Sequence, residues 1–150
     1  KGYDVILLHE NEKEIYGDTA ERCLDLLETL NCDYLKATFD PANFVQCDCE
    51  TYPKAFEMLS PYIEYMHIKD ANKNDHKVVP AGYGDGKVAE ILKALKEKGF
   101  NGFVSLEPHL ASFKGFADLE PNSPANAMEE GGSKQFAIAV EALDKVLNSL

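Results

Sequence analysis

The sequence lacks any long hydrophobic run. No apolar stretch approaches the roughly 20 residues that a membrane-spanning helix requires, and no signal-peptide pattern is present. Only four cysteines occur in 150 residues, which is too few for a disulfide scaffold. Cys47 and Cys49 have no second pair at zinc-site spacing. We therefore expect reduced thiols, a cytoplasmic location and no membrane partner.

Positive charge is also scarce. Lys and Arg total 15 against 26 Asp and Glu, so the formal net charge is −11. This balance repels phosphate backbones, and no basic stripe offsets it locally, so we expect no nucleic-acid partner. An acidic total can instead conceal a cluster of carboxylates that binds a metal ion. The content of 45% hydrophobic and 27% charged residues is that of an ordinary globular domain, and the length predicts one domain.

Short apolar runs alternate with amphipathic helical patterns four times along the chain. The runs are rich in β-branched and aromatic residues, which favours buried strands. They cover Val5–Leu8, Tyr34–Phe39, Ile63–Ile68 and Phe103–Leu106. A helical pattern follows each run. The first pattern begins at a cap formed by Asp18, the second begins at Thr51, the third ends at Gly99, and the fourth extends from Phe136 to Leu147. Four consecutive strand–helix units predict a parallel sheet with right-handed crossovers.

The length of these units favours one architecture. A (β/α)₈ TIM barrel of about 250 residues uses about 31 residues per unit, so four units make half a barrel. A small doubly wound fold is the alternative, but its glycine-rich turn is missing after the first strand, where residues 9–12 read His-Glu-Asn-Glu. The chain starts without methionine and enters a strand almost at once. We therefore expect residues 1–150 to be half of a longer barrel.

The residues that terminate the strands point to a site. The four ends carry Glu10, Asp40, His67 and Glu107. In parallel α/β folds the carboxyl ends of the strands meet at one rim, where ligands bind. Mixed carboxylate and imidazole ligands suit Mn²⁺, Mg²⁺, Co²⁺ or Zn²⁺ and leave positions open for substrate or water. The sequence therefore predicts a divalent-metal site formed by these four side chains.

A glycine-rich segment follows the third strand at a distance. Gly82, Gly84 and Gly86 are spaced like a phosphate-binding loop, but the Lys-Ser/Thr end of such a loop is missing. The segment is therefore interpreted as a tight turn before the next helix.

Five segments, taken in order, resemble the sugar phosphate isomerase/epimerase family with a xylose-isomerase-like barrel. They are Leu8–Asn11, Phe39–Phe44, His67–Asp70, Ala81–Gly86 and Ser105–Leu110. Relatives include ketose 3-epimerases, hydroxypyruvate isomerases and inosose dehydratases. The resemblance covers nearly the whole chain but only the C-terminal half of the family's barrel. It implies four parallel β/α units, with the N-terminal half outside residues 1–150.

The resemblance also implies a metal-dependent activity in carbohydrate metabolism. By position, Glu10, Asp40, His67 and Glu107 are the metal ligands, and Glu10 and Glu107 also move protons on the substrate. The chemistry is consistent, because a metal chelated by a carbonyl and a neighbouring hydroxyl stabilises the enediolate formed when the proton leaves. Two carboxylates can then remove and return that proton, giving epimerisation or isomerisation of a sugar or hydroxy-keto compound.

Several further residues are candidate substrate contacts. Asn43 stands where the epimerases often have a histidine, and Lys73 where they often have an arginine. Lysine cannot form the bidentate contact of arginine, so the substrate is expected to differ from a free ketohexose. Lys69 shares strand parity with His67, and three positions stay open for it: facing the substrate, behind the candidate ligands, or at the protein surface. Position in the motifs adds Asn11 and His109.

Three alternatives stay open. A dehydratase or lyase of a polyol such as an inosose shares the first proton abstraction. An endonuclease with this barrel is disfavoured by the net charge of −11. Four strands leave both sheet edges free, so the chain is otherwise an inert half-barrel, or one that pairs with a missing N-terminal half or with a second copy. We expect the isolated half to have weak activity or none.

Overall fold

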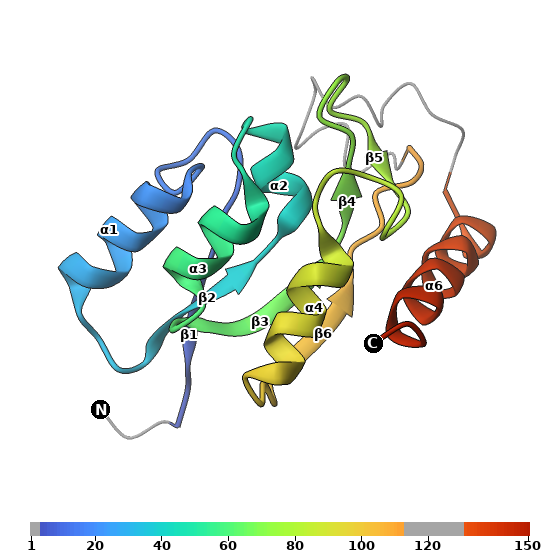
Figure 1. Cartoon of the computed structure of the whole chain (residues 1–150). Helices are drawn as coiled ribbons and strands as arrows, with labels where there is room; N and C mark the ends of the chain where they lie inside the picture. The colour runs from blue at the N-terminus through green and yellow to red at the C-terminus, as the bar shows by residue number, and fades with distance from the viewer. Residues whose placement is uncertain (1–3, 113–130) are drawn as a thin grey trace.

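Four parallel strands form the central sheet of the protein (Figure 1), whose computed structural model describes residues 4–112 and 131–150. The strands are β1 (Leu7–Glu10), β2 (Leu35–Phe39), β3 (Ile63–Ile68) and β6 (Phe103–Leu106). They lie in the order β1-β2-β3-β6, and every neighbouring pair is parallel. The predicted parallel sheet of consecutive strand–helix units is therefore confirmed.

The register of the strands aligns their carboxyl ends. Leu7 pairs with Leu35 at the start of β1, and Tyr65 pairs with Phe103 on the other side of the sheet. The residues at or just beyond the carboxyl ends consequently share one edge of the sheet. This edge is the part of the fold that positions the candidate site.

The first strand is displaced from its predicted position. We expected Val5–Leu8, but pairing starts only at Leu7 and continues to Glu10. Val5 and Ile6 are 57% and 47% exposed. The prediction is wrong by two residues because the neighbouring strand, and not the apolar run, determines where pairing begins. Leu7 is the first residue that bonds to it, by donating its N–H to the Tyr34 carbonyl.

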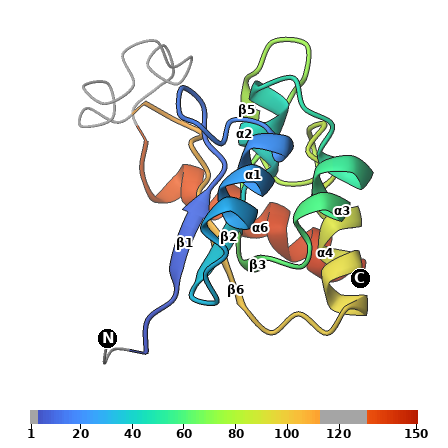
Figure 2. The same cartoon turned by 90° about the vertical axis from the view of Figure 1, so that its left-hand side faces the viewer.

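Helices line one face of the sheet, as Figures 1 and 2 show for α1, α3 and α4. The helical elements are α1 (Ala20–Leu30), α2 (Pro41–Gln46), a π-type turn (Thr51–Ala55), α3 (Phe56–Leu59), α4 (Val88–Glu97) and α6 (Ser133–Leu147). A small antiparallel hairpin, β4 (Asp70–Ala71) with β5 (Val78–Val79), follows β3. No helix in the described ranges is long and apolar enough to cross a membrane.

The main core lies between this face and the helices. Phe39 and Met66 on the strands are fully buried, as are Phe44 on α2 and Ile91 on α4. Phe39 packs against Phe44 with ring centroids 5.1 Å apart. The burial of these large side chains is the main stabilising contribution that fixes the helices on the sheet.

Two helix starts differ from the prediction. The cap of α1 is Thr19, whose hydroxyl accepts from the Arg22 N–H, so the expected cap at Asp18 is wrong. Asp18 instead forms an ion pair with the Arg22 guanidinium at 2.7 Å. The helix α2 was not predicted, because its six residues are too few to show a helical period.

Exposed apolar side chains gather at both sheet edges and on α6. The edge group comprises Val5, Ile6, Leu7, Leu8, Phe103 and Val104. On α6, Phe136 and Val140 are 52% and 37% exposed. Ala139 and Ala142 are buried instead. Among the described residues β1 and β6 each have one neighbouring strand, as expected of an incomplete barrel.

A buried carboxylate holds the glycine-rich segment against the end of β3. Asp70 is fully buried, and its oxygens accept from the N–H groups of Gly82, Gly84 and Gly86 at 2.8–3.0 Å. It also accepts from the Ala71 N–H at 2.9 Å. The segment is therefore a turn, as predicted, and its N–H groups bind an internal anion.

We predict that Gly84→Ala strongly destabilises the fold. A Cβ at Gly84 would collide with the Asp70 carboxylate and lie 2.6 Å from the Ala71 carbonyl. Neither group can move without loss of its hydrogen bonds, so we expect a loss of about 2 kcal/mol in the free energy of unfolding. Urea unfolding of the purified variants measures this.

The matched control is Gly132→Ala. Gly132 has an extended backbone and open space around it, so its loss should stay below about 1 kcal/mol. Equal losses in the two variants would contradict the assigned role of the Asp70 contact.

Candidate metal centre

The four strand-end side chains that the sequence singles out converge in space. One ligand atom from each of Glu10, Asp40, His67 and Glu107 lies within 4.8 Å of all the others. Each residue comes from a different strand end, so the parallel register assembles the cluster. Among the described residues these four form the group with the spacing that a metal ion requires.

The imidazole of His67 is at the centre of the cluster. Its Nδ1 is 2.8 Å from Glu10 Oε1, 3.4 Å from Glu107 Oε2 and 4.0 Å from Asp40 Oδ2. The side chains of Glu10 and Glu107 are 31% and 34% exposed, whereas that of Asp40 is completely buried. Two carboxylates therefore face solvent, and the third lies beneath them.

Asp40 is fixed through both its side chain and its backbone. Oδ1 accepts from the Asn43 N–H at 3.0 Å and so caps α2, which begins with Pro41. The Asn11 amide donates to the Asp40 carbonyl at 2.8 Å and accepts from the Asp40 N–H at 2.9 Å. Asn11 therefore fastens the end of β2 to the loop that follows β1.

Lys69 supplies a buried positive charge to the same group. Its ammonium is 3.0 Å from Asp40 Oδ2 and 2.9 Å from Glu107 Oε2, and its side chain is 1% exposed. Its burial contradicts the surface position that the sequence left open, and a direct contact of Lys69 with substrate stays a prediction. The lysine lies instead among the groups that surround the candidate ligands.

Close contacts shift the pKa values of these side chains. The hydrogen bonds of His67 to Glu10 and then to Glu107 raise the pKa of the imidazole to about 10. Burial raises the pKa of Asp40 to about 6, against the opposing charge of Lys69. Burial disfavours the charged forms of Lys69 and Glu107 too, but opposite charges outweigh it. The pKa of Lys69 is raised by Asp40 and Glu107, and that of Glu107 is lowered by His109, His67 and Lys69.

The donor set fits a divalent cation. Three carboxylates and one imidazole match the hard and borderline ligands of Mn²⁺, Mg²⁺, Co²⁺ and Zn²⁺. Asp40 Oδ2 is buried, and the Lys69 ammonium lies 3.0 Å from it on one side.

The other three predicted substrate contacts differ in how close they lie to the cluster of candidate ligands. Asn43 is buried and donates to the Asn11 carbonyl at 2.9 Å and to Glu12 Oε2 at 3.1 Å. His109 Nε2 lies 3.5 Å from Glu107 Oε1, at the side of the cluster. Lys73 is exposed in the turn between β4 and β5, and its backbone N–H donates to Asp85.

Sequence reasoning did not assign a role to Glu12 or Asp70. Glu12 is connected to the cluster through Asn43. The Nδ2 of Asn43 donates to Glu12 Oε2 at 3.1 Å and lies 3.5 Å from Glu10 Oε1. Asp70 anchors the glycine turn next to Lys69. The sequence does show three glycines soon after Asp70. Their hydrogen bonds to the Asp70 carboxylate, however, depend on the path of the chain after β3.

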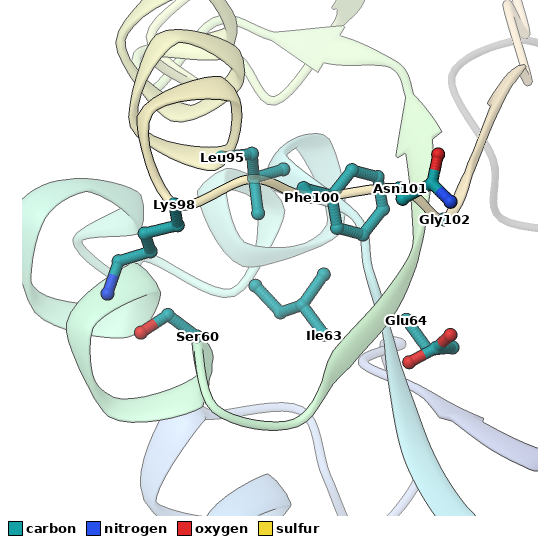
Figure 3. A pocket seen from close by; sticks show the side chains of 8 residues that line it. All are labelled: Ser60, Ile63, Glu64, Leu95, Lys98, Phe100, Asn101 and Gly102. Carbon is teal, nitrogen blue, oxygen red and sulfur yellow. The ribbon is translucent and has the colours of Figure 1, made fainter.

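A separate pocket lies at the opposite end of the strands (Figure 3). Its volume is about 340 Å³, and Ile63 and Glu64 at the start of β3 line it together with Gly102 before β6. None of the candidate ligands borders it. The candidate chemistry therefore belongs to the carboxyl-end cluster.

Three solved structures resemble the chain in fold. One is a D-psicose 3-epimerase with D-tagatose from Clostridium cellulolyticum H10, 22% identical with a TM-score of 0.65, over 98% of this chain and 49% of that chain. The IolI protein with a binding zinc atom is 20% identical with a TM-score of 0.64, over 99% and 50%. A probable 3-DHS dehydratase involved in petrobactin synthesis from Bacillus anthracis is 18% identical with a TM-score of 0.64, over 95% and 49%.

A curated relative matches in sequence over part of its length. This uncharacterized protein of Methanocaldococcus jannaschii is 27% identical over 106 residues, which are 65% of this chain and 33% of that protein. The chain thus spans about a third of the curated relative and about half of the solved structures.

The sequence model of one family, the xylose isomerase-like TIM barrel, matches residues 1–132. That match covers all four strands and the four candidate ligands. The parallel strand–helix units and the partial coverage of the solved structures agree with part of such a barrel. The chain therefore belongs to the xylose isomerase-like TIM barrel family.

Proposed function

We propose that the protein is a divalent-metal-dependent isomerase or epimerase that acts on a sugar or hydroxy-keto compound. The convergence of Glu10, Asp40, His67 and Glu107 within 4.8 Å is the observation that carries the proposal. The similarity in fold to a D-psicose 3-epimerase and to a zinc-binding IolI protein supports it.

These four residues would hold the metal ion. When bound, a divalent cation supplies positive charge that stabilises the substrate oxygens as a carbon-bound proton leaves. His67 would act as a ligand in its neutral form through Nδ1, the ring nitrogen that faces the carboxylates of Glu10 and Glu107 at 2.8 and 3.4 Å. Asp40 is held rigidly by Asn11 and by its cap on α2, so it fixes the inner side of the site.

The difference in burial supports Glu10 and Glu107 as the proton-transfer groups among the three carboxylates. Glu10 and Glu107 are about one-third exposed, at 31% and 34%, so a substrate can reach them. Asp40 is completely buried and cannot meet a substrate carbon. Glu107 has a lowered pKa because its bonds to His109, His67 and Lys69 outweigh its burial. It is therefore ionised at neutral pH, which is the form that a general base requires.

A dehydratase is the second candidate. It removes the same proton and then expels a β-hydroxyl group, so the same carboxylates serve both reactions. The similarity in fold to a probable 3-DHS dehydratase favours keeping it. The two reactions differ in their products and not in the first step.

We predict that the purified protein binds about one divalent cation per chain and that Glu107→Gln weakens this binding. An amide is a poorer ligand than a carboxylate, so we expect a loss of at least about tenfold in affinity for Mn²⁺. Elemental mass spectrometry after dialysis against Mn²⁺ measures the content, and titration calorimetry measures the affinity.

The control is Glu141→Gln on α6, where the carboxylate is 70% exposed and paired with Lys145. It should retain the affinity of the unmodified protein. A protein that takes up no Mn²⁺, Mg²⁺, Co²⁺ or Zn²⁺ would exclude the proposed function.

We also predict proton exchange on a substrate carbon. In D₂O with Mn²⁺, the complete barrel, of which residues 1–150 are expected to be half, should introduce deuterium next to the carbonyl group of one member of a panel of ketohexoses and hydroxy-keto acids. Glu10→Gln and Glu107→Gln should each lower the exchange rate by about 10²–10⁴-fold, because each removes a proton-transfer group. Proton NMR follows both the exchange and the product.

The product decides between the two candidate reactions. A deuterated isomer or epimer supports the proposal, whereas a product that has lost water supports the dehydratase. Unchanged exchange in both variants would show that other groups move the proton. The rate of Glu141→Gln, whose side chain is on the outer surface of α6, should equal that of the unmodified protein.

A further inference from the structure

The contacts of Lys69 concern the same oxygens that a metal ion would use. Asp40 Oδ2 and Glu107 Oε2 face the His67 imidazole at 4.0 and 3.4 Å. The Lys69 ammonium lies 3.0 and 2.9 Å from these two oxygens. A cation in the cluster and the ammonium would therefore be neighbours across shared ligand atoms.

The net charge of the four candidate ligands together with Lys69 follows from their ionised forms. Glu10, Asp40 and Glu107 carry three negative charges when ionised, and Lys69 supplies one positive charge. His67 is neutral when it acts as a ligand. Two negative charges remain, which matches the charge of one divalent cation.

Lys69 has no alternative place for its charge. Its side chain is 1% exposed, and both of its ion-pair partners belong to the cluster. A buried ammonium is stable only while it is paired, so it stays beside these carboxylates whether or not a metal is bound.

We propose that Lys69 is a built-in counter-cation of the metal centre, which stabilises the metal-free cluster and lowers its affinity for metal. This inference rests on the proposed metal site. The ammonium and a bound metal ion would repel each other and compete for the same two oxygens. Each cation would therefore weaken the binding of the other to Asp40 and Glu107. Lys69 thereby leaves the site with the charge that one divalent cation neutralises. It acts through Asp40 and Glu107 and is a positioning residue.

The test compares the unmodified protein with Lys69→Met, which keeps an unbranched side chain that is one atom shorter and removes its charge. Titration calorimetry at fixed pH and ionic strength should show Mn²⁺ bound about tenfold more tightly, or more, because a nearby repelling charge is gone. Without metal, the variant should have a lower Tm, since Asp40 loses its partner, and added Mn²⁺ should raise its Tm further than that of the unmodified protein.

A trivalent ion separates charge balance from a purely structural role. Coulomb energy scales with charge, so the gain in log affinity for Tb³⁺ should be about one and a half times the gain for Mn²⁺. A change caused by misplaced ligands would not follow the charge of the ion. Lys13→Met is the matched control, because Lys13 is 30% exposed and pairs with Glu12 beside the cluster. Its effect on Mn²⁺ affinity should stay within about twofold.

The outcomes are distinct. Unchanged or weaker Mn²⁺ binding by Lys69→Met, an equal gain in Lys13→Met, or failure of Lys69→Met to fold in excess Mn²⁺ would each overturn the counter-cation role. The last result counts because the metal should replace the lost charge. If the unmodified protein itself binds no divalent cation, the proposed function fails instead.

Discussion

The burial of the Asp40 carboxylate is the constraint on which the rest of the site depends. Removing a carboxylate from water costs several kcal/mol unless charges and hydrogen bonds compensate it. Here Asn43 donates to one oxygen, Lys69 pairs with the other, and Asn11 binds the Asp40 backbone. Lys69 extends the network to Glu107 at 2.9 Å. These residues follow β1, β2, β3 and β6, so one network joins the carboxyl ends of all four strands.

One face of the sheet carries the apolar core, and the edge at the carboxyl ends of the strands carries the candidate site. The helices pack on one face through Phe39, Met66 and Ile91, and this apolar burial stabilises the units. Polar groups concentrate beyond the carboxyl ends, where the turn anchored by Asp70 and the cluster around His67 lie together. In TIM barrels the packed strands provide stability, whereas the residues at the carboxyl rim provide the chemistry. The loops at this rim can change without altering the packed strands.

Much of the fold followed from local pattern, and its failures have physical causes. β3 and β6 begin and end where the apolar runs predict. β1 moved by two residues because an edge strand takes its limits from its neighbour. The short helix α2 escaped notice, although Asp40 followed by Pro41 is a helix-start signal, because six residues show no period. On α6 the buried residues are Ala139, Ala142 and Val146, and their burial depends on tertiary packing that the helical pattern alone does not specify.

The sequence by itself determined the family, the parallel strand–helix order and the four strand-end side chains, because strands are recognised by local hydrophobicity and parallel strands end at one rim. It did not determine the partners of Asn11 and Lys69, which were expected near a substrate. Only the tertiary structure decided that Asn11 binds the Asp40 backbone and that Lys69 lies buried between Asp40 and Glu107. Such contacts join residues about 30 to 40 positions apart, and they depend on strand register and side-chain direction, which local pattern does not contain.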